Sequence, residues 1–414
     1  MNHRSQAAKI LASLLNHGKT IDVLFNHNEE ATTKAYVYQT CRWFFQLDAI
    51  ANHLLTKPMK EKDNDVFCLL LIGLCDLLQS DNKEHAVVSE TVNSTKALKK
   101  PWAKGLLNAC LRKFLREKEA LLEAINKDEQ AHYAHPQWFI DSMKSAWPDN
   151  WQTILNANNH QAPMFLRLNP HKGHIDNYQQ QADNITAPTI QLKEAVAVEK
   201  LSGFHQGHVS VQDQASQYVA PLLSLQSQHK VLDACSAPGG KTGHLLETQA
   251  DISLTALDIS DTRLEKVKQN LDRLGFSATL KAADASDTQS WWDGELFDRI
   301  LIDAPCSGSG VIRRHPDIKL LRRETDIAGF AKQQLALLTS LWPLLKPQGI
   351  LLYTTCSVLP QENAQLVESF LEQVKDASVV DFELPIGQPC DIGWQCFPQI
   401  NSHDGFYYCL LSHQ

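Results

Sequence analysis

The sequence lacks the paired cysteine motifs that mark zinc sites and disulfide frameworks. Its ten cysteines are spread over all 414 residues, and none stands in a CxxC pair with metal-like spacing. We therefore expect no metal site. The chain is also much larger than secreted scaffolds held by disulfides, so free thiols in a reducing, cytoplasmic setting are expected. Such thiols are either buried core residues or reactive groups.

Long hydrophobic runs and an excess of positive charge are also missing. The longest apolar run, Val66 to Cys75, is about half of the length that spans a bilayer, so no membrane segment is expected. Lys9 interrupts the apolar residues near the start, which argues against a signal peptide. The net charge of −8 excludes a uniformly basic nucleic-acid coat protein, but it leaves room for a locally basic groove.

Glycine and proline are sparse in residues 1–130, and the apolar residues there recur at helical spacing. Helices are predicted at residues 66–78 and 103–115, and the whole range is predicted to be an all-α bundle. Residues 131–215 are predicted to be a small α/β connecting region, because prolines punctuate short segments there (Pro136, Pro148, Pro163, Pro170 and Pro188). Residues 216–414 form the third predicted domain of a multidomain α and α/β protein.

A basic stretch lies toward the end of the predicted helical bundle. Between Lys96 and Lys118 there is a single acid, Glu117, against eight basic residues (Lys96, Lys99, Lys100, Lys104, Arg112, Lys113, Arg116 and Lys118). Two interpretations are open. The stretch is either a solvated helix face or a surface that contacts the phosphates of a nucleic acid.

Short apolar strands alternate with helical segments from residue 216 onward. Strands are predicted at residues 231–234, 254–258, 279–284, 297–303 and 350–355, and helices at residues 263–274 and 324–346. This alternation is typical of a parallel, doubly wound sheet, whose binding sites lie outside the carboxyl ends of its strands. We expect the site at that edge, because the chemically distinctive residues of the chain follow those strand ends.

A glycine-containing loop follows the first of these strands. It runs Cys235-Ser236-Ala237-Pro238-Gly239-Gly240-Lys241, and its paired glycines allow close approach of the backbone to a ligand. The spacing matches neither a dinucleotide fingerprint nor a phosphate-binding P-loop. Asp258, Asp284 and Asp303 end the next three strands, where carboxylates can accept hydrogen bonds from a ribose diol or an adenine amino group. Because carboxylates favour a sulfonium cation and disfavour phosphates, the set indicates S-adenosylmethionine as cofactor.

Two cysteines follow neighbouring strands of the predicted sheet. Cys306 comes after Pro305 at the fourth strand end, and Cys356 comes after Thr355 at the fifth. A lone cysteine is usually a small buried hydrophobe, but two beside a predicted cofactor site indicate covalent catalysis. A thiolate that adds to C6 of cytosine makes C5 nucleophilic enough to accept a methyl group. Asp303 can supply a hydrogen bond or a proton at N3 of the ring.

These motifs resemble those of the NOL1/NOP2/Sun family of RNA cytosine-C5 methyltransferases, and the resemblance runs nearly end to end. The matching segments include residues 209–214 (VSVQDQ), 235–242 (CSAPGGKT), 297–317 (with DAPCSGSG) and 351–363 (LLYTTCSVLPQEN). The pair of DAPCSGSG and TTCS is highly specific. The first domain resembles, more loosely, the NusB-type helical RNA-binding domain.

The resemblance implies a role for each site residue and a substrate. Cys356 would be the nucleophile, and Cys306 would assist product release, whereas DNA cytosine methyltransferases attack with the cysteine that follows proline. Cofactor contacts would come from the loop Cys235–Lys241, Asp258, Asp284 and Asp303. The implied substrate is one cytosine in the helix-31 loop of 16S ribosomal RNA, on which the chain is expected to act as a monomer.

The resemblance also implies the domain order. It predicts a NusB-like helical RNA-binding domain over residues 1–130, a connecting α/β (RNA-recognition-like) region over residues 131–215, and a Rossmann-like methyltransferase domain over residues 216–414. Three alternatives stay open: the same chemistry on transfer RNA or 23S ribosomal RNA, a non-catalytic ribosome-assembly factor that only binds RNA, and DNA methylation. The intact cysteines speak against the second. Ser307, in place of the glutamine that follows the cysteine in DNA enzymes, speaks against the third.

Overall fold

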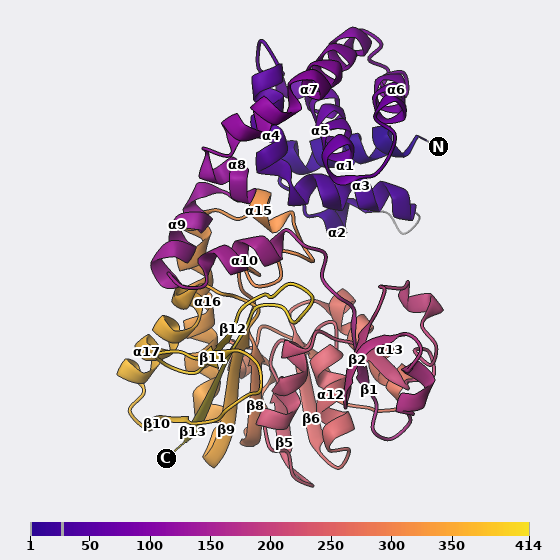
Figure 1. The fold of residues 1–414 in the computed structure, drawn as a ribbon. Helices are drawn as coiled ribbons and strands as arrows, with labels where there is room; N and C mark the ends of the chain where they lie inside the picture. The colour runs from indigo at the N-terminus through magenta and orange to yellow at the C-terminus, as the bar shows by residue number, and fades with distance from the viewer. Residues whose placement is uncertain (1, 26–28, 414) are drawn as a thin grey trace. The chain divides into compact units, whose positions relative to one another are not determined.

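The structure is a computed structural model that describes residues 2–25 and 29–413, and the chain divides into two compact units (Figure 1). Unit 1 comprises residues 1–161 together with residues 312–324. Unit 2 comprises residues 162–311 and 325–414. In the described part of the chain, no helix is both long and apolar enough to cross a membrane.

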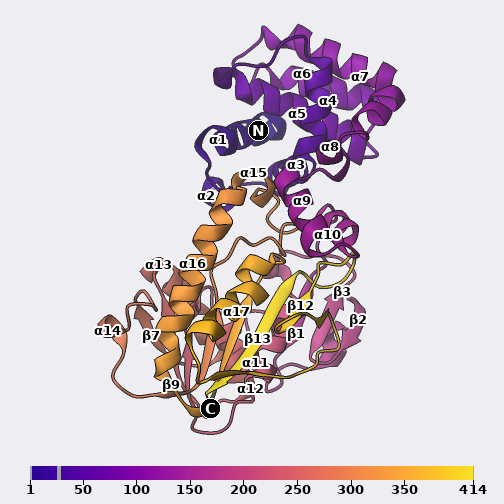
Figure 2. The same ribbon diagram turned by 90° about the vertical axis from the view of Figure 1, so that its left-hand side faces the viewer.

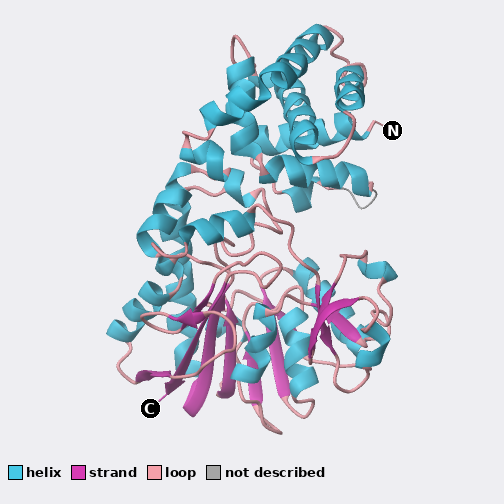
Figure 3. Ribbon diagram, viewed as in Figure 1, coloured by secondary structure: helices cyan, strands magenta, loops and turns pink. Residues whose placement is uncertain are grey.

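Unit 1 is helical throughout its described residues, as Figure 3 shows, and the prediction of an all-α bundle is confirmed. Leucine-rich faces of these helices form one apolar core, in which α5 is buried on nearly every side. Its helices are α1 (His3–His17), α2 (Ile21–Leu24), α3 (Ala31–Arg42), α4 (Phe44–Leu54), η1 (Glu61–Asp63), α5 (Asn64–Gln79), α6 (Glu84–Ser94), α7 (Ala103–Ile125), α8 (Glu129–Tyr133), α9 (Gln137–Ala146), α10 (Trp151–Asn158) and α15 (Ile318–Leu321).

The segment 312–324 packs within unit 1, although the residues that flank it belong to unit 2. Lys319 of this segment is buried, and its Nζ donates hydrogen bonds to the carbonyl oxygens of Arg42 (2.8 Å) and Ala134 (2.9 Å) and to the side chain of Asn159. Burial lowers the pKa of Lys319 well below its usual range. A buried amine of this kind is stabilised only by such acceptors, so the segment is anchored there.

The first part of unit 2 is a small antiparallel sheet in the order β2-β3-β1-β4. Its elements are β1 (Phe165–Leu168), η2 (Ile175–Tyr178), β2 (Ala182–Thr186), β3 (Thr189–Leu192), η3 (Val198–Lys200) and β4 (Val209–Val211). Alternate residues of β3 are buried, Ile190 and Leu192, and they join Leu166 of β1 in a separate apolar cluster. The period of two is that of a strand with one face on a core.

The second part of unit 2 is a doubly wound sheet in the order β11-β12-β13-β9-β8-β5-β6-β7. Strands β5 to β9 pair in parallel, as predicted. Their bounds are β5 (Lys230–Asp233), β6 (Ser253–Asp258), β7 (Thr279–Ala282), β8 (Phe297–Asp303) and β9 (Leu345–Thr355). Four antiparallel strands extend the sheet beyond β9, namely β10 (Ala377–Val380), β11 (Gln388–Pro389), β12 (Trp394–Cys396) and β13 (Phe406–His413).

Helices cover both faces of this sheet. On one face, α16 (Glu324–Leu341) and α17 (Ala364–Gln373) cover the sheet, as Figure 2 shows. Their apolar side chains share one cluster with Ile300 and Ile302 of β8. On the other face, α12 (Gly240–Thr248) and α13 (Asp261–Leu274) pack around Leu301. The middle of β8, residues 300–302, is therefore a continuous apolar run because both faces of the strand are buried there. Shorter helical turns complete unit 2: η4 (Ala215–Tyr218), α11 (Val219–Leu222), α14 (Thr288–Trp291), η5 (Trp342–Leu344) and η6 (Pro360–Glu362).

The helix predicted at residues 103–115 extends to Ile125, and the strand predicted at residues 350–355 begins at Leu345. Two further predicted boundaries were also wrong. The helix predicted at residues 324–346 ends at Leu341, because Pro343 follows within a 3-10 turn and β9 begins at Leu345. The strand predicted at residues 279–284 ends at Ala282, so Asp284 lies in the loop two residues beyond it. Neither change moves a site residue away from the carboxyl edge of the sheet.

Candidate active site

The loop between β5 and α12 is shaped for close contact with a ligand. Gly239 has φ +96°, and a Cβ at this position would lie 2.9 Å from the Cα of Val267, so only glycine fits. Ser236 Oγ donates to the carbonyl oxygen of Leu257 (2.9 Å), which ties the loop to the end of β6. The backbone thus passes close to the cavity with little side-chain bulk at its turn.

Beneath the loop, Asp233 at the end of β5 is fully buried and accepts a hydrogen bond from Thr242 Oγ1 (2.7 Å). Burial raises the pKa of Asp233 to about 7. Cys235 lines the cavity, and burial raises the pKa of its thiol. This thiol is therefore poorly suited to act as a nucleophile.

Two of the predicted acids lie along one side of the cavity. Asp258 ends β6, and its carboxylate accepts hydrogen bonds from the backbone nitrogens of Ala237 (3.3 Å) and Ser260 (3.0 Å) and contacts Arg263 (3.2 Å). Asp284 accepts from the backbone nitrogen (2.9 Å) and hydroxyl (2.7 Å) of Ser286. The structure places both acids, like the predicted glycine loop, at the carboxyl edge of the sheet.

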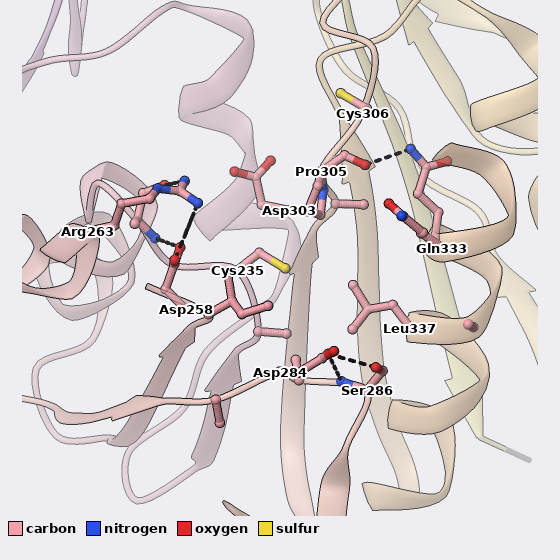
Figure 4. Close-up of a pocket in the computed structure, with 18 of the residues that line it drawn as sticks. Cys235, Asp258, Arg263, Asp284, Ser286, Asp303, Pro305, Cys306, Gln333 and Leu337 are labelled. Atoms are coloured by element: carbon pink, nitrogen blue, oxygen red, sulfur yellow. Dashed lines mark hydrogen bonds and ion pairs between the residues drawn. The ribbon is translucent and has the colours of Figure 1, made fainter. Parts of the chain in front are cut away.

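One cavity of about 540 Å³ joins these residues, and it lies entirely within unit 2. Figure 4 shows Cys235 and Asp303 between the Asp258–Arg263 pair on one side and Leu337 of α16 on the other. Cys306 and Cys356 also line it. Carboxylates, a glycine turn and an apolar wall suit a ligand that carries hydroxyls, an adenine ring and a positive charge.

Lys241 forms an ion pair that sequence reasoning did not anticipate. Its Nζ lies 2.6 Å from Oδ2 of Asp303 and 5.1 Å from the centre of the Phe406 ring. Burial lowers the pKa of Lys241, but the Asp303 carboxylate outweighs this and raises it. The Asp303 carboxylate is therefore held in the cavity by a neighbouring positive charge, which suits a side chain that must form a hydrogen bond with a nucleobase.

The two predicted catalytic cysteines lie side by side. Cys306 follows the end of β8, Cys356 follows the end of β9, and their Sγ atoms are 3.4 Å apart. The hydrogen bond with Cys356, together with burial, raises the pKa of Cys306 well above its usual value. The Cys306 thiol therefore favours its protonated form while the two sulfurs are in contact.

Sequence reasoning missed the residues that support these loops and overestimated the free charge of the basic stretch. Glu362 and Gln334 contact the loop of Cys306 from segments distant in the chain, and no spacing in the sequence predicts this. Lys100 is bound by Asp63 (2.9 Å) and Asp65 (2.6 Å), so it is a structural residue rather than a free phosphate ligand.

Over the described ranges, no group of three or more His, Cys, Asp or Glu residues could hold a metal ion.

Comparison with known proteins decides the family. The model of the 16S rRNA methyltransferase RsmB/F family matches residues 220–412, the NusB family model matches residues 1–116, and the ferredoxin-like domain of RsmF/B-like methyltransferases matches residues 135–202. The ribosomal RNA small subunit methyltransferase B of Pseudomonas syringae pv. tomato is 45% identical, over 99% of this chain and 97% of the relative. This chain belongs to the 16S rRNA methyltransferase RsmB/F family.

Other relatives and solved structures agree with this assignment. The ribosomal RNA small subunit methyltransferase B of Vibrio cholerae is 40% identical, over 100% of this chain and 98% of the relative. The solved structure of PH0851 has a TM-score of 0.81 at 22% identity, covers 100% of this chain and 99% of its own, and shows the same fold. A methyltransferase homologue from Pyrococcus horikoshii has a TM-score of 0.60 at 25% identity, over 69% of this chain and 98% of its own. The chain is an RNA methyltransferase of this family, and its methyl donor is S-adenosylmethionine.

Proposed function

We propose that this RNA methyltransferase modifies C5 of one cytosine in 16S ribosomal RNA through a covalent adduct between Cys356 and C6 of the base. The observation that carries the proposal is the pair of thiols 3.4 Å apart, in the same cavity as Asp303. C5 of cytosine is a poor nucleophile, and a thiolate on C6 removes that difficulty. A cavity that only bound RNA would need neither thiol.

The residues of the cavity divide the reaction between them. Cys356 forms the Sγ–C6 bond, while Asp303 holds N3 of the ring with a hydrogen bond or a proton that offsets the charge of the attacked ring. Once C5 carries the methyl group, a base removes the C5 proton, and the electrons of that C–H bond restore the C5–C6 double bond. The Sγ–C6 bond then breaks, Cys356 leaves as a thiolate, and Cys306 assists this elimination. Lys241 keeps Asp303 in place throughout, because its Nζ forms an ion pair with the Asp303 carboxylate at 2.6 Å.

The cofactor would be held by the loop Cys235–Lys241, with Asp258 on the ribose and Asp284 on the adenine. S-adenosylmethionine supplies an electrophilic methyl group carried on a sulfonium. The residues fit this group, since the carboxylates of Asp258, Asp284 and Asp303 line the cavity together with the apolar side chains of Ala237 and Leu337. The absence of a phosphate-binding lysine loop also favours this ligand over a nucleotide triphosphate.

The proposed target is the helix-31 loop, and the chain is proposed to act on it as a monomer, with residues 1–130, 131–215 and 216–414 as RNA-binding, connecting and catalytic domains. The NusB match over residues 1–116 supports a separate RNA-binding part, and the relatives named for the small subunit favour 16S over 23S ribosomal RNA or transfer RNA. Bisulfite sequencing of ribosomal RNA from a strain without this gene tests the target. A helix-31 cytosine that stays methylated there would refute it.

The two thiols give the test of mechanism. Cys356→Ala is expected to abolish methyl transfer and to leave no covalent protein–RNA complex. Cys306→Ala is expected to attack and methylate but to release the product slowly, so that a complex accumulates and survives a denaturing gel. The opposite pattern would exchange the two roles, and full turnover in both variants would rule out covalent catalysis by these residues.

A further inference from the structure

A buried acid lies behind the two cysteine loops and outside the cavity. Glu362 is 0% exposed, and its Oε2 accepts hydrogen bonds from the hydroxyls of Ser307 (2.5 Å) and Ser357 (2.6 Å). Its Oε1 accepts a third from the backbone nitrogen of Ser307 (2.8 Å). Each serine directly follows one of the two cysteines. One carboxylate therefore contacts both loops at the residue next to each thiol.

A second side chain extends this network to helix α16. Gln334 Nε2 donates to Oε1 of Glu362 (3.1 Å) and to the carbonyl oxygen of Pro305 (2.8 Å), the residue before Cys306. The loop that carries Cys306 is thus held on both sides of its thiol. None of these groups is solvent-exposed except Pro305, so the hydrogen bonds are not exchanged for water.

We propose that Glu362 is a positioning residue that holds the two cysteine loops in register, so that both thiols reach the same base. The inference rests on the proposed function and names a residue on which that function depends. The β8–β9 ladder ends at Asp303 and Thr355, and beyond it neutral hydrogen bonds also join the loops, such as Gly310 N to the carbonyl oxygen of Cys356 (2.9 Å). Glu362 adds a charged acceptor that both loops share next to the thiols. Charge-assisted hydrogen bonds from buried donors are strong enough to fix them.

Three variants separate geometry from charge. Glu362→Gln keeps the shape: its amide oxygen can accept from Ser307, and its NH2 can donate to the hydroxyls of Ser307 and Ser357, since hydroxyls both donate and accept. Glu362→Ala removes every contact. Glu362→Asp keeps the charge but shortens the reach, and it replaces the alanine variant if that variant fails to fold. Glu368→Ala, an exposed acid on α17, is the matched control.

The first readout is the single-turnover rate of methyl transfer, with the affinity for S-adenosylmethionine measured by calorimetry. A displacement of about 1 Å costs roughly 100-fold in rate, so Glu362→Ala and Glu362→Asp should lose about that factor. Glu362→Gln should recover most of the rate. Cofactor affinity should be unchanged in all of them, because Glu362 does not line the cavity.

The second readout needs no RNA. Phenylarsine oxide, a trivalent arsenical, binds two thiols that are held close together. The part of its binding that is lost in Cys306→Ala or Cys356→Ala is the part that depends on this pair of thiols. The binding that depends on this pair of thiols should be retained in wild type, Glu362→Gln and Glu368→Ala. It should be lost in Glu362→Ala and Glu362→Asp.

Each outcome bears on one proposal or the other. Full rate and full arsenical binding in Glu362→Ala would overturn the positioning role. So would a Glu362→Gln variant that binds cofactor but is as slow as the alanine variant, because charge rather than geometry would then be what matters. If the variants bind the arsenical as expected but the wild-type chain does not methylate cytosine, the positioning role is supported and the proposed function is refuted.

Discussion

Replacing Asp258 tests the proposed cofactor site at its most polar point. The Asp258 carboxylate is 4% exposed, and backbone nitrogens of Ala237 and Ser260 already fix its orientation. A ribose diol would therefore meet an acceptor that needs no rearrangement. A hydrogen bond to a charged group is worth roughly 1.5–3 kcal/mol. Since about 1.4 kcal/mol is tenfold in affinity, Asp258→Ala should weaken S-adenosylmethionine binding about 10- to 150-fold.

Calorimetry on matched variants measures this loss. Asp258→Asn keeps the size of the side chain and one acceptor oxygen, so its affinity should lie between wild type and the alanine variant. Asp261→Ala removes an exposed acid from the start of the neighbouring helix α13 and should bind normally. If Asp258→Ala unfolds at the wild-type temperature and still binds the cofactor like wild type, Asp258 does not hold the ribose.

The buried acid and the basic stretch give two further predictions. Burial raises the pKa of Asp233 from 3.8 to about 7, so the native state keeps a proton that the unfolded chain has released. Between pH values equal to these two pKa values, the free energy of unfolding should fall with rising pH by roughly 4 kcal/mol relative to Asp233→Asn. Urea unfolding of both proteins across this pH range measures the difference, and a difference that does not change with pH would refute the prediction. Replacing Lys99 and Lys104 with Glu should weaken RNA binding and flatten its salt dependence in a filter-binding assay. Lys100→Met should instead mainly lower the free energy of unfolding, because the partners of Lys100 are Asp63 and Asp65. An unchanged salt slope would assign the stretch to a solvated face.

The carboxyl edge of the sheet could be predicted because its signals are local. Strands β5, β6, β8 and β9 each contain a short apolar run and end at or just before a chemically distinctive residue, such as Asp258 or Asp303. The run is apolar because both faces of these strands are buried. Parallel strands bring those ends to one edge. The meeting of Cys306 and Cys356 therefore followed from the alternation of strands and helices, and the 3.4 Å separation of their sulfurs confirms that they lie together.

The parts of the fold and of the site that could not be predicted depend on contacts between residues far apart in the chain. Glu362 meets Ser307 across 55 positions, and Lys100 meets Asp65 across 35. A sequence shows the charge of such residues but not their partners, so Lys100 was grouped with its exposed neighbours. The anchoring of Lys319 by Arg42 and others in unit 1 is of the same kind. The antiparallel strands after β9 were missed because they are short or, like β13, buried without alternation.

The separation of the two thiols also suggests an order of events under the proposed mechanism. Two thiolates 3.4 Å apart would repel each other by about 5 kcal/mol at an effective dielectric constant of about 20. Only one of them can then be ionised at a time. The proposed mechanism assigns that state to Cys356, while the hydrogen bond between the thiols and burial raise the pKa of Cys306. Once Cys356 has bonded to C6, its sulfur is a neutral thioether, and the hydrogen bond that held the proton on Cys306 is lost. The pKa of Cys306 then falls, so Cys306 becomes reactive only after the adduct exists, which is when the elimination step requires it.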